Sequence, residues 1–285
     1  MSTAEMIEMD EQVLDAPHIA HGLDIYWLTI NGLNIRVGIR HGGGRGNPLL
    51  ILNGIGASFE VLESFINAME DTEIIIFDMP GAGKSDTPIL PWLMSHYARL
   101  TARVLDQLGY TSVDVLGLSW GGALAQQFAR QYSSRCHKLV LCATSSGSAM
   151  FPGRPKTLLK MLSPRRYLDK KYMLRIAGDL YGGRMRQDTS QVEEHANKVQ
   201  STSSRGYYYQ VLAIATWSSL HWLHKLRMPT LIIHGTDDPI IPHVNARVMA
   251  SRIPNAELWL MDCGHLFMLT MADTIAPEIA SFLRR

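Results

Sequence analysis

The chain has 285 residues, of which 46% are hydrophobic, and its formal net charge at pH 7 is +1. These values are typical of a globular protein, and the near-neutral charge gives no reason to expect a nucleic acid as a partner. Three cysteines, Cys136, Cys142 and Cys263, are widely spaced and odd in number, which argues against a disulfide framework or a C-x-x-C metal site and suits a reducing compartment.

The N-terminal part combines an acidic segment with a predicted hairpin. Residues 1–15 contain neither Lys nor Arg and do not form a secretory signal, and we expect residues 1–20 to be a poorly ordered lead. Two alternating segments, 24–30 and 33–39, are predicted strands, and Asn31-Gly32 between them is typical of a type I′ turn. No run in the chain reaches the ~18 apolar residues of a transmembrane helix. The chain is therefore expected to begin with antiparallel strands.

After the hairpin, apolar segments typical of buried strands alternate with segments of helical composition. Strands are predicted at 48–53, 73–77, 112–116, 137–143, 229–235 and 257–261, and helices at 58–69, 94–108, 121–130, 243–251 and 266–283. Strands and helices that alternate at this spacing form right-handed βαβ units. We therefore predict an α/β protein whose sheet has eight mostly parallel strands, including the antiparallel N-terminal hairpin, with helices on both faces.

The alternation stops between Ser145 and Leu226, where the sequence is helical and rich in aromatic residues. This segment contains 13 Lys and Arg against 5 Asp and Glu, so it is basic while the rest of the chain is acidic. We interpret residues 145–226 as a helical cap inserted after the sixth strand, with residues 21–144 and 227–285 forming the core. Most of its aromatic side chains must pack inside the cap, but some are candidates for contact with a substrate. These candidates are Tyr207, Tyr208, Trp217 and Trp222.

Several motifs that resemble cofactor or metal sites lack the necessary context. Residues 41–46 are glycine-rich but precede a strand instead of opening a helix, which argues against a dinucleotide site. Gly83-Lys84-Ser85 resembles the end of a P-loop, but Asp78 stands where the first glycine is required, so we predict a structural turn. His221 and His224 share a helical spacing, but no cysteine or carboxylate partner is close in sequence. We therefore predict neither a cofactor nor a metal.

The motif Gly117-Leu118-Ser119-Trp120-Gly121 stands between a predicted buried strand and a predicted helix. In that context a G-x-S-x-G forms a tight turn that exposes the serine hydroxyl above the sheet edge, and its glycines allow close backbone approach. The following helix directs its N-terminal amides toward an oxyanion that forms beside the serine. Ser119 is therefore the candidate nucleophile.

A serine hydroxyl needs a base, and the base needs an orienting carboxylate. Two predicted strands are followed by such residues: Asp237 and Asp238 follow one, and His265 follows the other. The order serine, aspartate, histidine is that of the α/β-hydrolase scheme. We favour Asp238 as the acid because the third residue after Gly235 can turn back toward His265, and we expect Asp237 to cap the turn.

The expected chemistry is acyl transfer. His265 removes the proton from Ser119, which attacks an ester carbonyl, and water then cleaves the acyl-enzyme. The glycines of Asn53-Gly54-Ile55-Gly56 let the backbone turn at a strand end, so the amide of Ile55 and that of Trp120 are the candidates for the oxyanion hole.

The chain resembles the intracellular poly(3-hydroxyalkanoate) depolymerases that act on medium-chain-length polyester, a branch of the α/β-hydrolase superfamily. The resemblance extends over about residues 25–284, and its segments are Asn53–Gly56, Ser119–Phe128, Ser163–Tyr167, Tyr181–Gly183, Gly206–Tyr208, His221–Lys225, Asp237–Pro239 and Gly264–Phe267. The acidic lead departs from the family pattern.

The resemblance implies a Ser119, Asp238 and His265 triad in a cytoplasmic enzyme that acts on a water-insoluble polyester at the surface of storage granules. The same triad is compatible with other hydrolases of small soluble substrates, namely a carboxylesterase, a thioesterase or a C–C bond hydrolase. An alternative of a different class is a non-catalytic protein of the same fold that binds a ligand or coats granules.

Overall fold

The computed structural model describes residues 18–43, 46–199 and 203–285. Its centre is a nine-stranded sheet with the strand order β1-β2-β3-β5-β4-β6-β7-β8-β9. The strands are β1 (His18–Ala20), β2 (Leu23–Ile30), β3 (Leu33–Arg40), β4 (Leu49–Leu52), β5 (Ile74–Phe77), β6 (Val113–Leu118), β7 (Cys136–Cys142), β8 (Thr230–Gly235) and β9 (Ala256–Met261). Pairing is antiparallel from β1 to β5 and parallel from β5 to β9. The predicted mostly parallel sheet with an antiparallel N-terminal hairpin is therefore confirmed.

The N-terminal strands differ from the prediction at one point. Strand β1 pairs with β2 and adds a ninth strand within the segment that was expected to be a poorly ordered lead. The remainder of that predicted lead, residues 1–17, lies outside the described residues. Between β2 and β3, Asn31 and Gly32 both have positive φ, as the type I′ turn requires.

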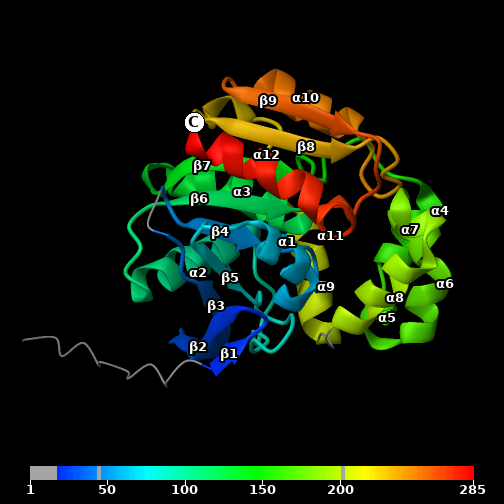
Figure 1. Ribbon diagram of the computed structural model, residues 1–285, viewed down its shortest axis with the longest axis horizontal. Coiled ribbons are helices and arrows are strands. Elements are labelled where there is room, and N and C mark those ends of the chain that lie inside the picture. Colours follow the sequence, from blue (N-terminus) through cyan, green and yellow to red (C-terminus); the bar gives the residue numbers. More distant parts are fainter. Residues whose placement is uncertain (1–17, 44–45, 200–202) are drawn as a thin grey trace, which may run out of the picture.

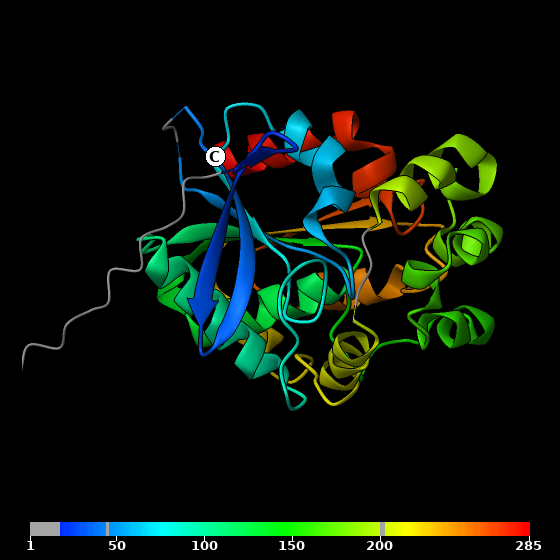
Figure 2. The same cartoon turned by 90° about the horizontal axis from the view of Figure 1, so that it is seen from below.

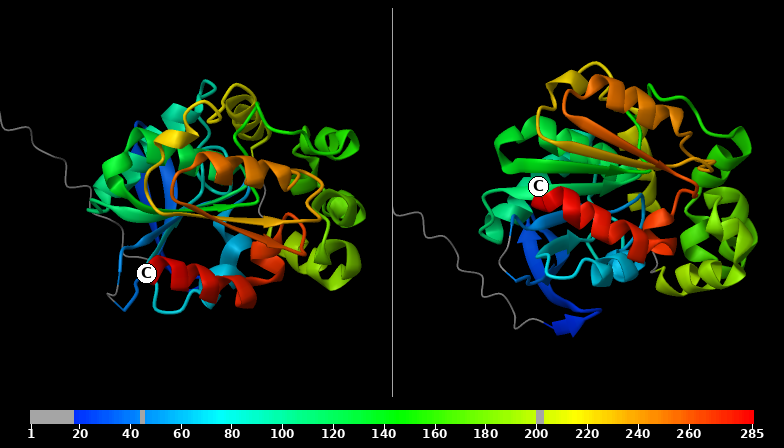
Figure 3. Two further views of the ribbon diagram at one scale, coloured as in Figure 1. Left: turned by 90° about the horizontal axis from the view of Figure 1, so that it is seen from above. Right: turned by 45° about the horizontal axis from the view of Figure 1, so that its top comes forward.

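Helices cover both faces of the sheet. Helices α1 (Glu63–Ala68) and α12 (Ala272–Arg284) pack on one face, and α2 (Met94–Gln107), α3 (Trp120–Gln131) and α10 (Val244–Arg252) pack on the other. Figure 3 shows α10 and α12 on opposite sides of β8 and β9. Val113 and Val115 of β6 enter one hydrophobic layer and Leu116 and Leu118 enter the other, which explains why this strand has apolar residues on both faces.

We call residues 145–226 the cap, and its described parts contain the helices between β7 and β8. These are α4 (Pro155–Met161), α5 (Arg165–Leu168), α6 (Lys170–Tyr181), α7 (Arg184–Gln187), α8 (Thr189–Lys198), α9 (Ser204–Ala215) and the 3₁₀ turn η3 (Leu223–Lys225). Figure 1 shows α4 to α8 beyond the carboxyl end of β8, and Figure 2 shows them on the opposite side of the molecule from the β2–β3 hairpin. The cap therefore lies over the edge of the sheet where the strands end, and the candidate residues Ser119, Asp238 and His265 follow those strands.

Three shorter elements complete the chain. They are the 3₁₀ turns η1 (Phe59–Leu62) and η2 (Ser133–Arg135) and the helix α11 (Phe267–Thr270). The predicted helix 58–69 thus begins as a 3₁₀ turn, and the predicted helix 266–283 is interrupted, because Met271 has a φ of −137° that lies outside the helical region.

The segment that resembles a P-loop is a turn, as predicted. Asp78 follows β5 directly and is fully buried, and its Oδ2 accepts a hydrogen bond of 2.9 Å from the amide of Lys84. The same carboxylate lies 3.3 Å from the guanidinium of Arg36. Asp78 therefore holds the loop in place of the glycine that a phosphate site needs at this position.

Candidate active site

The turn between β6 and α3 presents Ser119 at the edge of the sheet. Ser119 has a φ of 55° and a ψ of −116°, a strained backbone conformation for a residue with a side chain. Side chains are excluded around it, because a Cβ added at Gly117 would lie 2.4 Å from the carbonyl oxygen of Gly121, and one added at Gly121 would lie 2.0 Å from that of Leu52. The strand, the helix and the glycines thus confirm the elbow that the motif predicted.

Asp238 follows β8 and is buried at the base of the site. Its Oδ1 accepts hydrogen bonds of 2.9 Å from the amides of both Ile240 and Ile241, and its Oδ2 lies 2.7 Å from Nδ1 of His265. Burial raises the pKa of a carboxyl group, but here the charge of His265 and hydrogen bonds from His234 and His265 outweigh it. The pKa of Asp238 therefore lies well below its usual range, and this residue is a carboxylate at any working pH.

His265 joins the carboxylate to the serine. Its Nε2 lies 3.0 Å from Oγ of Ser119, and its backbone amide donates to the carbonyl of Tyr181 at 2.7 Å. The ring of Tyr181 stacks on the imidazole at an interplanar angle of 14°. The structure thus brings together the serine, histidine and aspartate that were predicted from three separate loops, and their atoms are connected in the order that proton transfer requires.

Of the two neighbouring aspartates, Asp238 contacts His265 as predicted, but Asp237 does not have the role expected of it. Asp237 does not cap the turn, because Asp238 itself accepts the amides of the turn. Instead, Oδ2 of Asp237 accepts from the amide of Gly183 at 2.8 Å and from the guanidinium of Arg186 at 2.6 Å. Asp237 therefore connects the core to the cap.

His234 is a buried neighbour of the acid whose contact was not predicted from the sequence. Its Nε2 donates to the carbonyl of Ile241 at 2.8 Å and lies 3.4 Å from Oδ2 of Asp238. The spacing of four residues between His234 and Asp238 was the available signal, but only the fold of the loop shows that both side chains point inward.

The loop after β4 lies beside the serine. A Cβ added at Gly54 would be 3.8 Å from that of Ser119, and the side chain of Asn53 closes the loop by donating to the carbonyl of Ser58 at 2.8 Å. Within the described part of the chain, the amides of Ile55 and Trp120 have no hydrogen-bond partner. Both amides are therefore available to a ligand at Ser119.

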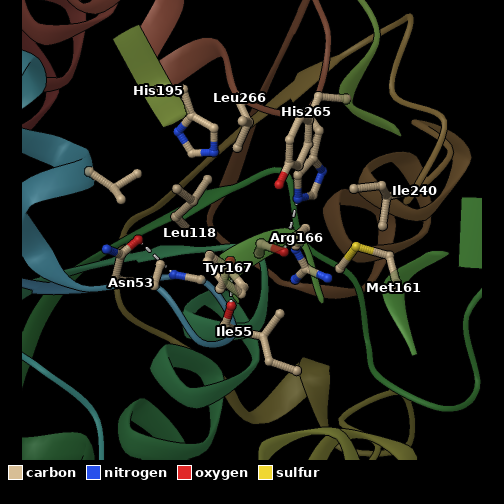
Figure 4. Close-up of a pocket in the computed structure, with 15 residues that line it drawn as sticks. Asn53, Ile55, Leu118, Met161, Arg166, Tyr167, His195, Ile240, His265 and Leu266 are labelled. Atoms are coloured by element: carbon tan, nitrogen blue, oxygen red, sulfur yellow. Dashed lines mark hydrogen bonds between the residues drawn. The ribbon is translucent and has the colours of Figure 1, made fainter. Parts of the chain in front are cut away.

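Two cavities meet at Ser119. The larger has a volume of about 300 Å³. Its lining is largely apolar and includes Met150, Leu158, Leu162, Val211, Ile214 and Ala215 from the cap. The smaller has a volume of about 30 Å³ and is more polar. Tyr181 contributes to its lining, as do Asn53, Arg166, His195 and His265, which Figure 4 labels.

Comparison with known proteins shows the family of the chain. The model of the alpha/beta hydrolase fold matches residues 47–272. The chain belongs to the alpha/beta hydrolase fold family. It is 50% identical over 259 residues to a poly(3-hydroxyalkanoate) depolymerase of Ectopseudomonas oleovorans, which covers 90% of this chain and 92% of the relative. The resemblance to poly(3-hydroxyalkanoate) depolymerases that the sequence motifs indicated is thereby confirmed.

More distant relatives and solved structures place the chain in the same fold. A 2-hydroxy-6-oxononadienedioate/2-hydroxy-6-oxononatrienedioate hydrolase of Burkholderia vietnamiensis is 28% identical over 90% of this chain and 93% of its own length. A hydrolase from Pseudomonas aeruginosa superposes with a TM-score of 0.78 at 20% identity, covering 92% of this chain and 98% of its own. An esterase from Exiguobacterium antarcticum has a TM-score of 0.77 at 24% identity, with coverages of 91% and 99%.

The four aromatic residues predicted to contact a substrate do not line either cavity of this alpha/beta hydrolase. Tyr207 is buried and accepts a hydrogen bond from Arg166. The indole N–H of Trp217 donates to the side-chain oxygen of Gln127 at 2.8 Å, and its ring packs against that of Trp222. Tyr208 is about half exposed. Aromatic content alone did not reveal which face of each helix turns toward Ser119, and the cap residues that line the larger cavity are aliphatic side chains and methionines instead.

The described residues contain no group of three or more His, Cys, Asp or Glu side chains placed to hold a metal ion. In the part of the chain described here, no helix is long and apolar enough to cross a membrane. His221 and His224, the pair with helical spacing, are both exposed and lie at or next to η3.

Proposed function

We propose that the protein is a serine hydrolase that cleaves the ester bonds of medium-chain-length poly(3-hydroxyalkanoate). The observation that carries the proposal is the connected arrangement of Ser119, His265 and Asp238, with distances of 3.0 Å and 2.7 Å, at the junction of an apolar cavity and a polar one. The 50% identity to a poly(3-hydroxyalkanoate) depolymerase supports the substrate class.

The first half of the reaction forms an acyl-enzyme. His265 takes the proton of Ser119 through Nε2 while Oγ attacks the ester carbonyl, and Asp238 stabilises the imidazolium that results. The amides of Ile55 and Trp120 donate to the oxyanion of the tetrahedral intermediate. His265 then returns the proton to the leaving alkoxide, which departs as the hydroxyl group of the released part of the chain.

The second half repeats these steps with water. His265 removes a proton from a water molecule that attacks the acyl-enzyme, and the carbonyl oxygen again receives hydrogen bonds from the two amides. Ser119 recovers its proton from His265 as the acid product leaves. No cofactor is needed for either half, because the nucleophile, the base and the oxyanion donors all belong to the chain.

The apolar cavity is suited to bind a hydrophobic acyl group of the substrate. Leu162 lines this cavity and is 55% exposed, so the cavity reaches the cap surface, where Leu159 and Leu212 are also exposed. A surface of this kind suits a water-insoluble polyester. This surface supports action at storage granules, and the resemblance to intracellular depolymerases implies that these granules lie in the cytoplasm.

The test compares substrates on wild-type protein and on Ser119→Ala. Wild-type protein should release 3-hydroxyacids or their oligomers from an emulsified medium-chain polyester, as followed by mass spectrometry. Ser119→Ala should lower that rate by at least about 10³-fold because it removes the nucleophile. Ser134→Ala, at an exposed serine of η2, is the matched control and should retain activity.

Other outcomes separate the alternatives. Hydrolysis of short p-nitrophenyl esters with no release from the polymer would favour a carboxylesterase or thioesterase, and turnover of a ring-cleavage product would favour a C–C bond hydrolase. Failure of a fluorophosphonate probe to label Ser119 would favour a non-catalytic binding protein.

A further inference from the structure

The polar cavity contains a buried arginine that has no acidic partner. Arg166 is 2% exposed and lies on α5 in the cap. Its Nη1 donates to the hydroxyl of Tyr207 at 2.7 Å, and its guanidinium lies over the rings of Tyr167 and Tyr207 at 4.6 Å and 5.1 Å. No Asp or Glu among the described residues lies within ion-pair distance of it, and its Nε has no hydrogen-bond partner there. A guanidinium is charged at any working pH, and an uncompensated buried charge is costly.

A second unpartnered group lines the same cavity. His195, on α8, is buried, and within the described residues neither ring nitrogen has a hydrogen-bond partner. Burial, and then the positive charges of Arg166 and Lys198, lower the pKa of His195 to about 4. The imidazole is therefore neutral and has one N–H group to donate. Arg166 and His195 together offer unused donors and one positive charge in an enclosed space.

The position of His265 indicates which part of a substrate enters this cavity. His265 lines the polar cavity and does not line the apolar one. In an acyl transfer the histidine gives its proton to the leaving oxygen, so the leaving part of the substrate lies on the side of His265. Figure 4 shows Arg166, His195 and His265 around one space.

We propose that the polar cavity binds the free carboxylate at the end of a polyester chain, with Arg166 and His195 as its donors. This inference rests on the proposed function and defines where the chain is cut. In a terminal 3-hydroxyacid unit, two carbon atoms separate the leaving oxygen from the carboxylate carbon. A carboxylate held by Arg166 therefore places the last ester bond of the chain at Ser119.

The volumes of the two cavities agree with this assignment. About 30 Å³ is room for roughly two water-sized groups, which suits the two oxygens of a carboxylate but not an alkyl side chain. The alkyl group on the third carbon can enter the cavity of about 300 Å³, because Ile55, Ser119, Met161 and Ile240 line both spaces.

The resulting step balances without a further reactant. Oγ of Ser119 forms a bond to the carbonyl carbon of the last ester, the bond from that carbon to the ester oxygen breaks, and His265 protonates that oxygen. The terminal 3-hydroxyacid leaves as a monomer, and water hydrolyses the acyl-enzyme to expose a new terminal carboxylate. The enzyme therefore shortens chains from the carboxyl end.

The test uses the dimer of 3-hydroxyoctanoate as the free acid and as its terminal carboxamide, which has similar size but no charge. Wild-type protein should cleave the acid with a kcat/KM at least about tenfold above that of the amide, because a charge-assisted bidentate contact is lost in the amide. In Arg166→Gln this preference should fall to about threefold or less, and in His195→Gln to an intermediate value.

Tyr207→Phe is the matched control. This variant removes the hydroxyl to which Nη1 of Arg166 donates but leaves the guanidinium in place. Because Tyr207 lies on α9, the variant tests whether the only role of Arg166 is to fix α9 in position. The preference for the acid should persist in Tyr207→Phe. If Arg166→Gln does not fold, Arg166→Lys, which keeps the charge without the planar fork, should show a reduced preference.

Equal cleavage of acid and amide by the wild-type protein would refute the carboxylate site, as would a full preference in a folded Arg166→Gln protein. Either result leaves the proposed function intact, provided that polymer is still degraded. The proposed function itself fails if neither the dimers nor the polymer are cleaved, so the two failures are distinguishable.

Discussion

The two sides of the active site are built in different ways. On the core side, the side chains of the catalytic acid and base are held by partners: Asp238 accepts two backbone amides, and His265 lies between Asp238 and Ser119. On the cap side, the described contacts leave Nε of Arg166 and both ring nitrogens of His195 unpaired. The difference indicates that the core is preorganised for chemistry, whereas the cap has groups left free for a ligand.

Two buried titratable residues illustrate the difference. Asp238 and His195 are both enclosed, and burial alone disfavours the charged form of each. Partners outweigh burial at Asp238, whose pKa is lowered so that it stays charged. At His195, burial and two nearby cations act together and lower the pKa to about 4, so that it stays neutral.

The largest expected effect comes from the core acid. Asp238→Asn should lower kcat for a p-nitrophenyl ester by roughly 10³ to 10⁴-fold, because an amide does not stabilise the imidazolium and favours the wrong tautomer of His265. Steady-state kinetics at several pH values measure this loss.

Asp237→Asn is the control from the neighbouring position. Asp237 binds Gly183 and Arg186 of the cap, so its replacement should change kcat for a small ester by only a few-fold. Comparable losses in the two variants would mean that the cap connection, and not the orientation of His265, limits the reaction.

A smaller effect is expected on stability, from the cap. His195 has a folded pKa of about 4, below the ordinary value of 6.5. Between these pH values the unfolded chain binds a proton that the folded protein does not bind, so stability decreases as the pH falls from about 6.5 to about 4. The total loss is on the order of 3 kcal/mol, at about 1.4 kcal/mol per pKa unit.

Urea unfolding at pH 7 and pH 4.5 measures this loss. His195→Gln should be less stable than wild-type protein at pH 7 but should lose less stability on acidification, because its side chain does not titrate. His224→Gln, at an exposed position, should follow the wild-type protein. An equal decrease in wild-type and His195→Gln proteins would show that His195 does not contribute.

The positions of the candidate residues in the core could be predicted from the sequence, because short turns after strand ends determine these positions. Glycines that exclude a Cβ, strands buried on both faces and residues placed directly after strand ends determine where Ser119, Asp238 and His265 lie. Those features are local, so a single sequence contains them. The turn shows the limit, because Asp238 accepts the turn amides that Asp237 was expected to accept, while Asp237 contacts the cap instead.

The cap lining could not be predicted in the same way. Helix α9 has apolar residues on more than one face, and tertiary packing decides which face meets the cavity. Tyr207 turns inward to Arg166, while Ile214 of the same helix lines the cavity. The polar cavity was missed because Arg166 and His195 come from separate helices. Arg166 stands in the resembling segment Ser163–Tyr167, but that segment does not show that the guanidinium lies near His195.

The smallest expected effect concerns the apolar cavity, and it tests whether the cap selects the acyl group without taking part in the chemistry. Ile214→Trp should fill part of the cavity of about 300 Å³ and lower kcat/KM for p-nitrophenyl octanoate by about tenfold, the scale expected for crowding in a hydrophobic pocket. The value for p-nitrophenyl acetate should change by less than about twofold, because a two-carbon acyl group does not reach α9.

Leu212→Trp provides the matched substitution on the exposed face of the same helix. Leu212 is 46% exposed and does not line the cavity, so this variant should behave as wild-type protein toward both esters. Equal losses on the acetate and the octanoate in Ile214→Trp would mean that α9 affects the position of Trp120 and the oxyanion donors, since Trp120 already donates its indole N–H to the carbonyl of Gln210 on α9 at 2.9 Å. In that case the core would not carry out catalysis independently of the cap, because α9 would contribute to catalysis as well as to the selection of the acyl group.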